Sequence, residues 1–135
     1  MTFAYVDSSC LVALAFDEPG AKKLATRLRR FDRLFSSNLL EAELRSALAR
    51  EEVDAEIEGL LSWLTWVYPN RPLTAELVRI TAAGYLRDAD LWHLANALFL
   101  APTATDLSFL TLNARQREIA RRLGFSSPVS SGRAS

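Results

Sequence analysis

The sequence predicts a single α/β domain in which a central parallel sheet has helices on both faces. The chain has 135 residues, enough for one domain with a substantial core and too few for two. Half of these residues are hydrophobic, so the chain is expected to fold without help. Short apolar runs alternate with segments in which apolar residues recur at helical spacing. This alternation is typical of parallel sheets whose strands are joined by helices.

In the first half of the chain, each predicted strand is a short apolar run and each predicted helix has apolar residues every three or four positions. Residues 3–6 are apolar throughout and predict a strand buried on both faces. Capping and turn residues mark the helix ends. We expect, in order, a strand at 3–6, a short helix stopped by Glu18-Pro19-Gly20, a helix at 21–31, a strand at 33–36, a helix at 39–50 capped by Ser37 or Asn38, and a helix capped by Asp54 that runs through Leu64.

The second half continues the alternation, with Pro, Gly and acidic residues at the segment ends. We expect a strand at 66–68 closed by Pro69-Asn70, a helix from Thr74 with Glu76 in its first turn, a helix at 88–100 with Asp88 as N-cap, a strand at 107–112, and a helix at 114–123 stopped by Gly124. Residues 126–135 are rich in serine. We therefore place the domain at residues 1–125 and expect a disordered tail at 126–135.

Charged residues cancel in number but are unevenly distributed. Sixteen basic and sixteen acidic residues give no net charge, which indicates nothing about partners. Basic residues gather in residues 22–33 and again after residue 115, and acidic residues gather in residues 41–58. Such blocks are typical of solvated helix faces. They also suit a protein that holds a polyanion around an acidic centre.

Several classes of protein are disfavoured by composition. The one cysteine, Cys10, cannot form an internal disulfide and is expected to be a buried thiol. The one histidine, His93, excludes a His-rich metal site. No apolar stretch approaches the roughly 18 residues of a membrane span. The N-terminus lacks the features of a signal peptide. We therefore expect a cytoplasmic protein with no membrane partner.

Two acidic residues in the first half of the chain are candidates for a functional site. Asp7 follows the first strand, at the end where open α/β sheets bind ligands, although it can equally cap the next helix. Glu43 falls inside the apolar stripe of the helix at 39–50. Glu41 lies at the margin of that stripe, with Arg45 one turn on as an exposed partner. Glu43 therefore needs an explanation and Glu41 does not.

The helix at 88–100 supplies a third candidate. Asp90 flanks the apolar stripe of this helix, whereas Asp88 is explained by capping. His93 is expected on the polar side with Asn96, as a surface or hydrogen-bonded histidine. A buried-face carboxylate is costly unless it is paired or bound to a cation. Oxygen ligands without a His or Cys cluster favour Mg²⁺ or Mn²⁺ over zinc, and such ions catalyse phosphoryl chemistry.

Four motifs follow one another along the chain: Val6-Asp7-Ser8-Ser9, Ala42-Glu43-Leu44, Asp90-Leu91-Trp92-His93-Leu94-Ala95 and Phe109-Leu110-Thr111-Leu112-Asn113. In order and spacing they resemble those of PIN-domain ribonucleases, above all the VapC-type toxins of bacterial and archaeal toxin–antitoxin pairs. The resemblance covers residues 2–125. It implies a PIN-like α/β/α sandwich with a parallel sheet of four to five strands, and a Mg²⁺- or Mn²⁺-dependent endoribonuclease. It also implies that Asp7, Glu43 and Asp90 bind the metal, with Ser8 and Thr111 as polar support.

One position departs from this pattern. Many relatives carry a fourth acid where this chain has Asn113. An amide oxygen can bind a hard cation, but it brings no charge and cannot act as a base, so a second metal is disfavoured. Asp106 does not replace the missing acid, because it lies at the start of the last strand and we interpret it as a turn residue.

The resulting hypothesis is a metal-dependent endoribonuclease that cuts single-stranded RNA and is inhibited by a VapB-like protein antitoxin. Basic helices at 22–30 and 115–122 are expected to hold the RNA backbone. The alternative is a PIN-fold binding module, inactive because of Asn113 and retained to bind an antitoxin or RNA. The resemblance also implies a homodimer, to which the apolar residues Leu60, Leu61, Trp63, Leu64 and Trp66 are expected to contribute.

Overall fold

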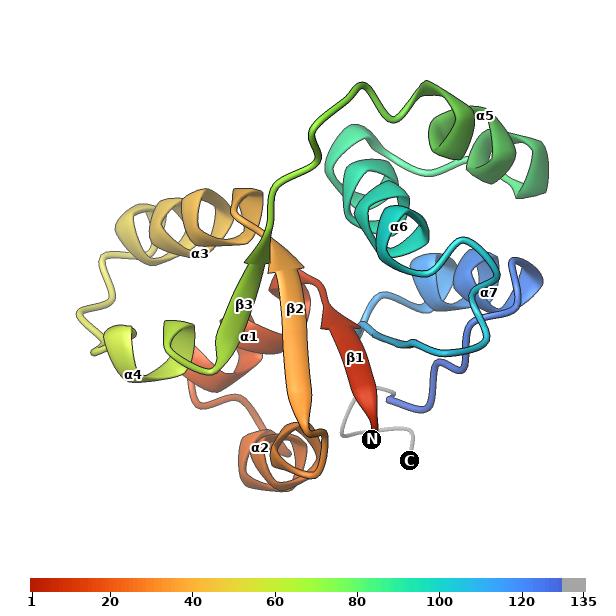
Figure 1. Ribbon diagram of the computed structural model, residues 1–135. Helices are drawn as coiled ribbons and strands as arrows, with labels where there is room; N and C mark the ends of the chain where they lie inside the picture. The colour runs from red at the N-terminus through yellow and green to blue at the C-terminus, as the bar shows by residue number, and fades with distance from the viewer. Residues whose placement is uncertain (130–135) are drawn as a thin grey trace.

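The described part of the chain, residues 1–129 of a computed structural model, folds around four parallel strands in the order β3-β2-β1-β4. Figure 1 shows this sheet between two groups of helices. The α/β/α sandwich with a parallel sheet is therefore confirmed. In chain order the elements are β1 (Phe3–Val6), α1 (Ser8–Ala15), α2 (Ala21–Arg29), β2 (Arg33–Ser37), α3 (Leu39–Arg50), α4 (Glu58–Leu61), β3 (Leu64–Val67), α5 (Thr74–Ala83), α6 (Asp88–Leu100), β4 (Ser108–Leu110) and α7 (Ala114–Arg122).

Two hydrophobic cores lie on opposite faces of the sheet. On β1, Tyr5 packs in the core formed with α5, α6 and α7, while its neighbours Ala4 and Val6 pack in the core formed with α1, α2 and α3. Successive side chains of a strand point to opposite faces, so every residue of this short strand needs to be apolar. This explains why an uninterrupted apolar run, without polar alternation, marked β1 in the sequence.

The predicted helix from Asp54 through Leu64 is wrong in most of its length. Helix α4 covers only Glu58–Leu61, and Leu64 is the first residue of β3. Leu64 pairs with Leu34 of β2, and the register continues through Val67, which pairs with Ser37. The backbone hydrogen bonds offered by β2 thus override the helical spacing of the leucines, a tertiary effect that local spacing does not report. Asp88 is also not a cap, because α6 begins at Asp88 itself and its N-cap residue is Arg87.

The chain keeps contact with the sheet beyond residue 125. Ser126 forms a parallel bridge with Ser108, and its carbonyl accepts a 2.8 Å hydrogen bond from the Phe109 N–H. Ser127 and Val129 are buried. The first four residues of the segment expected to be a disordered tail thus pack on the domain, and residues 130–135 lie outside the described residues.

The apolar residues expected at a dimer interface are partly used within the chain. Leu60, Leu61, Trp63, Leu64 and Trp66 pack against the core on the α1–α3 side of the sheet and are only partly exposed. Among the described residues, no helix is long and apolar enough to cross a membrane.

Candidate functional site

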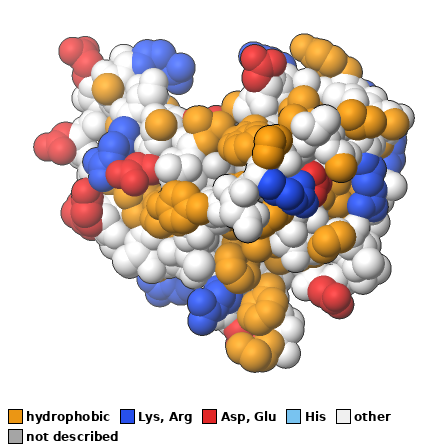
Figure 2. Space-filling view, turned by 45° about the horizontal axis from the view of Figure 1, so that its top comes forward, with side chains coloured by type: hydrophobic (Ala, Val, Ile, Leu, Met, Phe, Trp, Pro, Cys, Tyr) orange, Lys and Arg blue, Asp and Glu red, His pale blue; other side chains and the backbone are white. Residues whose placement is uncertain are grey.

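The acidic candidates meet at the carboxyl ends of the strands. Asp7 directly follows β1, and its N–H donates a 3.1 Å hydrogen bond to the Leu110 carbonyl at the end of β4. Helix α3 starts just after β2 and brings Glu43 to this end, and the first turn of α6 brings Asp90. Figure 2 turns this end towards the viewer and shows an indentation in the outline between the parts of the molecule that hold α3 and α5.

Asp7 is buried and is held by hydroxyl groups. Its Oδ1 accepts hydrogen bonds from the Ser9 N–H at 3.1 Å and from the Ser9 hydroxyl at 2.6 Å. The Thr111 hydroxyl lies 3.0 Å from Oδ2. Asp7 is therefore both the N-cap of α1 and the residue at the end of β1, so the two interpretations of it are compatible. The hydroxyl that reaches it belongs to Ser9, whereas the sequence interpretation named Ser8.

Burial raises the pKa of the Asp7 carboxyl from 3.8 to about 6. The nearby Asp90 acts in the same direction, while His93 and the hydrogen bonds from Ser9 and Thr111 lower this pKa. Burial outweighs these contributions because only 2% of the residue is exposed to water. Burial at this position therefore disfavours the charged form of the Asp7 carboxyl.

The Thr111 hydroxyl lies close to two hydrogen-bond acceptors. Its oxygen accepts a 3.0 Å hydrogen bond from the Asn113 N–H and lies 2.7 Å from Gln116 Oε1 as well as 3.0 Å from Asp7 Oδ2. A hydroxyl carries one proton, so Thr111 can donate to only one of the two acceptors at a time. The Gln116 amide cannot reverse its orientation without losing the 3.0 Å bond from Nε2 to the Asp90 carbonyl. Ionised Asp7 and the Gln116 amide oxygen therefore compete for the one hydroxyl proton of Thr111.

Glu43 is hydrogen-bonded to His93, the one histidine of the chain. Its Oε1 lies 2.6 Å from His93 Nε2, and its side chain is 27% exposed. The prediction that His93 lies on the polar side of α6 is wrong, because both His93 and Asn96 are completely buried. The polar partners of His93 are Tyr5 on β1 and Glu43 on α3. Helical spacing within α6 gives no information about residues on other elements. Glu41, by contrast, pairs with Arg45 at 2.8 Å, as predicted.

Asp90 is half-buried beside the other two acids. Burial raises the pKa of its carboxyl, and the charge of Glu43 adds to this effect. His93 and Arg87 act in the opposite direction and lower that pKa. Asp90 thus raises the pKa of Asp7, and Glu43 raises the pKa of Asp90. Nevertheless, within the described residues no three or more His, Cys, Asp or Glu side chains are arranged so that they could already hold a metal ion.

Asn113 has a clear structural task. Its Oδ1 accepts a 3.0 Å hydrogen bond from the Gln116 N–H and so caps α7. Because the cap requires oxygen in that position, the amide orientation is fixed. Its Nδ2 then points towards Asp90, with Oδ2 at 3.4 Å. The amide thus presents a donor, not an oxygen ligand, to the acids.

Comparison with models of known protein families identifies the family of this chain. The sequence matches the PIN domain family over residues 4–122. The chain belongs to the PIN domain family. PIN domains are generally nucleases that bind nucleic acid, and they typically depend on divalent metal ions. No curated protein matches the chain.

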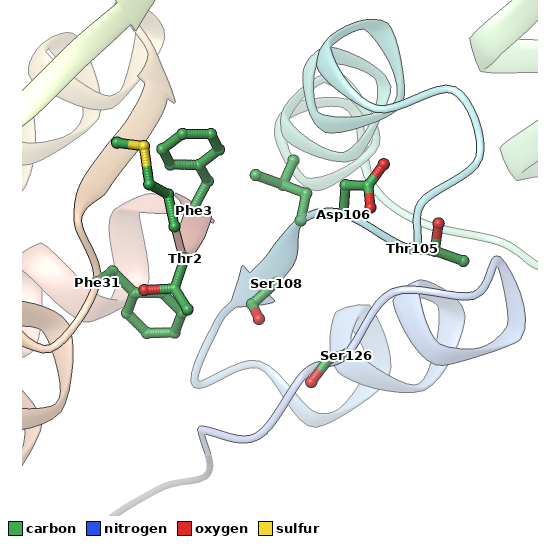
Figure 3. A pocket seen from close by; sticks show the side chains of 9 residues that line it. Thr2, Phe3, Phe31, Thr105, Asp106, Ser108 and Ser126 are labelled. Atoms are coloured by element: carbon green, nitrogen blue, oxygen red, sulfur yellow. The ribbon is translucent and has the colours of Figure 1, made fainter.

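An open cavity of this PIN domain lies at the other end of the sheet from the acids. It has a volume of about 470 Å³ and is lined by residues at the start of β1 and β4, such as Phe3 and Ser108, and by Phe31 before β2. Figure 3 shows Asp106 and Thr105 on the turn before β4, beside this cavity. Asp106 is therefore a turn residue, as predicted, and is far from Asp7 along the strands.

Helix α2 also lies at the amino-terminal end of the strands in the PIN domain, away from the acids (Figure 1). The basic residues at 22–30, which are expected to hold RNA backbone, therefore do not lie near Asp7. On α7, several arginines hold neighbouring chain segments. Arg122 donates to the Ala83 carbonyl at 2.8 Å and Arg121 to the Ser127 carbonyl at 2.7 Å.

Sequence reasoning missed four residues of this site in the PIN domain: Tyr5, Ser9, His93 and Gln116. Gln116 had a local signal, because an Asn followed three residues later by Gln at a helix start is similar to a capping box. Ser9 could not be distinguished from Ser8 without the backbone. Tyr5 and His93 are 88 positions apart and meet only in the folded chain.

Proposed function

We propose that this PIN domain is a Mg²⁺- or Mn²⁺-dependent endoribonuclease that cuts single-stranded RNA. One observation carries the proposal. Asp7, Glu43 and Asp90 reach the carboxyl end of the sheet from three elements, and burial raises the pKa of Asp7 and Asp90. Negative charges that repel one another in a partly buried site favour a cation that neutralises them.

The donor set fits a hard divalent cation, because every candidate ligand is a carboxylate oxygen. Asp7, Glu43 and Asp90 would hold the ion, which when bound supplies a Lewis acid and lowers the pKa of its water. The protein's own contribution is to orient the carboxylates. Ser9 and Thr111 hold Asp7, and Asn113 donates to Asp90. Ser8 has no such contact with Asp7 among the described hydrogen bonds, so we assign this support to Ser9.

The VapC-type role is the finer part of the proposal. It adds a VapB-like protein antitoxin, a homodimer and a cytoplasmic location, and it rests on the four motifs that end at Asn113. Arg115 and Arg117 lie near the start of α7, shortly after its cap residue Asn113, and are the candidates to hold the RNA backbone. A steep loss of RNA affinity with salt would support this arrangement.

Asn113 favours a second candidate function, a PIN-fold module that binds an antitoxin or RNA without cutting it. Its amide caps α7 and donates to Asp90, and the described residues place no fourth acid there. Cleavage of RNA distinguishes the two functions directly. A module would bind the RNA and leave it intact at every concentration of Mg²⁺.

The test compares two glutamates on one helix. Glu43→Gln is expected to abolish cleavage of a single-stranded RNA and the stabilisation of the fold by Mg²⁺. Glu41→Gln, which removes an exposed partner of Arg45, is expected to leave both nearly unchanged. In the wild type, Mg²⁺ at a hundredfold excess over its dissociation constant should stabilise the fold by about 2.7 kcal/mol. Equal effects of both substitutions would contradict the proposed role of Glu43.

A further inference from the structure

A chain of hydrogen bonds crosses the sheet face beneath the acids. The Ser37 N–H lies 2.9 Å from the Tyr5 hydroxyl oxygen, which lies 2.7 Å from His93 Nδ1. At the other side of the ring, His93 Nε2 lies 2.6 Å from Glu43 Oε1. Three elements, β2, β1 and α6, are thereby linked to a carboxylate on α3.

The direction of this chain follows from what each group can donate. A backbone N–H can only donate, so Ser37 donates to Tyr5 and the hydroxyl proton of Tyr5 is free to point to His93 Nδ1. At the other end, an ionised carboxylate can only accept, so His93 Nε2 must carry a proton. One arrangement therefore satisfies both ends of the chain of hydrogen bonds, with a proton on Nε2 and a lone pair on Nδ1.

The surroundings leave His93 little freedom to adopt another arrangement. Tyr5 and His93 are both completely buried. The Tyr5 ring stacks on Phe109 with a centroid separation of 5.5 Å and meets the His93 ring edge-on. The hydroxyl of Ser37 accepts a 3.3 Å bond from Trp92, the residue before His93. The ring can therefore hardly turn without breaking several contacts.

We propose that Tyr5 and His93 are positioning residues, which fix the orientation of Glu43 by donating a directed hydrogen bond to one of its two oxygens. Within residues 1–129, no hydrogen bond is made to the other oxygen, Oε2, which therefore stays available to a cation. This inference rests on the proposed function, because it concerns the orientation of a carboxylate that would bind the metal. Hydrogen-bond partners that orient a metal-binding side chain are commonly worth a factor of about 10–100 in metal affinity.

The first experiment determines the tautomer without any metal. His93 is the only histidine of the chain, so ¹⁵N-labelled histidine in protein without a histidine tag gives the signals of this one ring. Correlations between ring protons and ring nitrogens at mildly alkaline pH, with EDTA present, are expected to show the proton on Nε2. In Tyr5→Phe the preference for that tautomer should weaken. A proton on Nδ1 in the wild type would overturn the inference and leave the proposed function intact.

The second experiment measures Mn²⁺ binding from the electron paramagnetic resonance signal of the free ion. His93→Leu removes the donor to Glu43 and is expected to raise the dissociation constant for Mn²⁺ about tenfold or more. His93→Gln retains an N–H that can donate near the position of Nε2, and it should recover most of the affinity. Urea unfolding in EDTA checks that both variants fold. If the leucine variant does not fold, the wild-type tautomer still decides the inference.

The outcomes separate the inference from the proposed function. Wild-type affinity in both His93 variants would overturn the positioning role while the metal site stands. An equal loss in the two variants would also overturn it, because a general packing defect would then explain the loss. If the wild type binds no Mn²⁺, the proposed function fails, and the positioning role fails with it.

Discussion

Two aspartates at opposite ends of β1 show how differently one kind of side chain behaves in this fold. Asp32 lies at the amino-terminal end, where the Thr2 N–H donates to its Oδ2 at 2.6 Å, and it is fully exposed. The bond from Thr2 lowers the pKa of the Asp32 carboxyl. Asp7 lies at the carboxyl end, where burial raises the pKa of its carboxyl to about 6.

The comparison indicates that hydrogen bonds alone do not decide the charge of a carboxylate. Asp7 has more hydrogen-bond donors near it than Asp32, yet its charged form is disfavoured because water is excluded. Asp32, which directly precedes β2, is joined by hydrogen bonds to Thr2, which directly precedes β1. Because its pKa is raised, ionised Asp7 lowers the stability of the metal-free fold at neutral pH. A buried negative charge of this kind is expected where a carboxylate binds a cation.

The largest expected effect is on RNA cleavage. Asp7→Asn should reduce the rate on the order of a hundredfold or more, because a metal-binding carboxylate contributes several kcal/mol of charge stabilisation. Asp32→Asn should cleave at nearly the wild-type rate, since it changes the same atoms at the other end of the strand. Gel analysis of a labelled single-stranded RNA in Mg²⁺ measures both. A similar loss in the two variants would show that the two ends of β1 do not differ in function.

The next effect is on the stability of the metal-free protein. The folded state binds the Asp7 proton more tightly than the unfolded chain, so this group stabilises the fold below pH 4 and that stabilisation is lost as the pH rises through about 6. Asp7→Asn should therefore be more stable than the wild type at pH 8, by up to about 3 kcal/mol, and this advantage should vanish at pH 4.

Urea unfolding in EDTA at the two pH values measures this difference. The amide of the Asp7→Asn variant can accept from Ser9 and donate to Thr111, whose proton then serves Gln116, so every polar contact remains satisfied. Asp32→Asn, the matched variant, should not be stabilised at pH 8. A destabilised Asp7→Asn at pH 8 would mean that capping of α1 outweighs the cost of the buried charge.

The smallest expected effect concerns Asn113. Asn113→Asp keeps an acceptor for the cap of α7 but replaces the donor to Asp90 by a negative charge. We expect the metal-free protein to lose on the order of 1 kcal/mol of stability. The Mg²⁺ concentration for half-maximal cleavage should fall and the rate at fixed Mg²⁺ should rise. Asn113→Ala is the control, which removes the cap and the donor to Asp90 without adding a charge and should cost about 1 kcal/mol of stability. Identical Mg²⁺ titrations for Asn113→Asp and the wild type would show that residue 113 does not act on the metal.

The fold could be predicted because its main signals are local. The apolar run of β1 and the helical spacing of α3 and α7 gave elements whose limits agree with the structure to within a residue or two. The segment between α3 and β3 could not be predicted, because Leu64 is placed by hydrogen bonding to β2, 30 residues earlier in the chain. The candidate acids could also be found, since each stood on a face or at a strand end where a charge is costly.

By itself, the sequence determined the alternation of strands and helices, the place of Asp7 at the end of β1 and the phase that separates Glu43 from Glu41. These features depend on the period of a helix or a strand, which neighbouring residues define. Only the tertiary structure decided that His93 is buried between Tyr5 and Glu43, that Ser9 holds Asp7, and that the Asn113 amide turns its donor to Asp90. These contacts join residues on different elements or depend on which way a side chain turns, and hydrogen bonding at a distance of about 3 Å is fixed only when the elements pack.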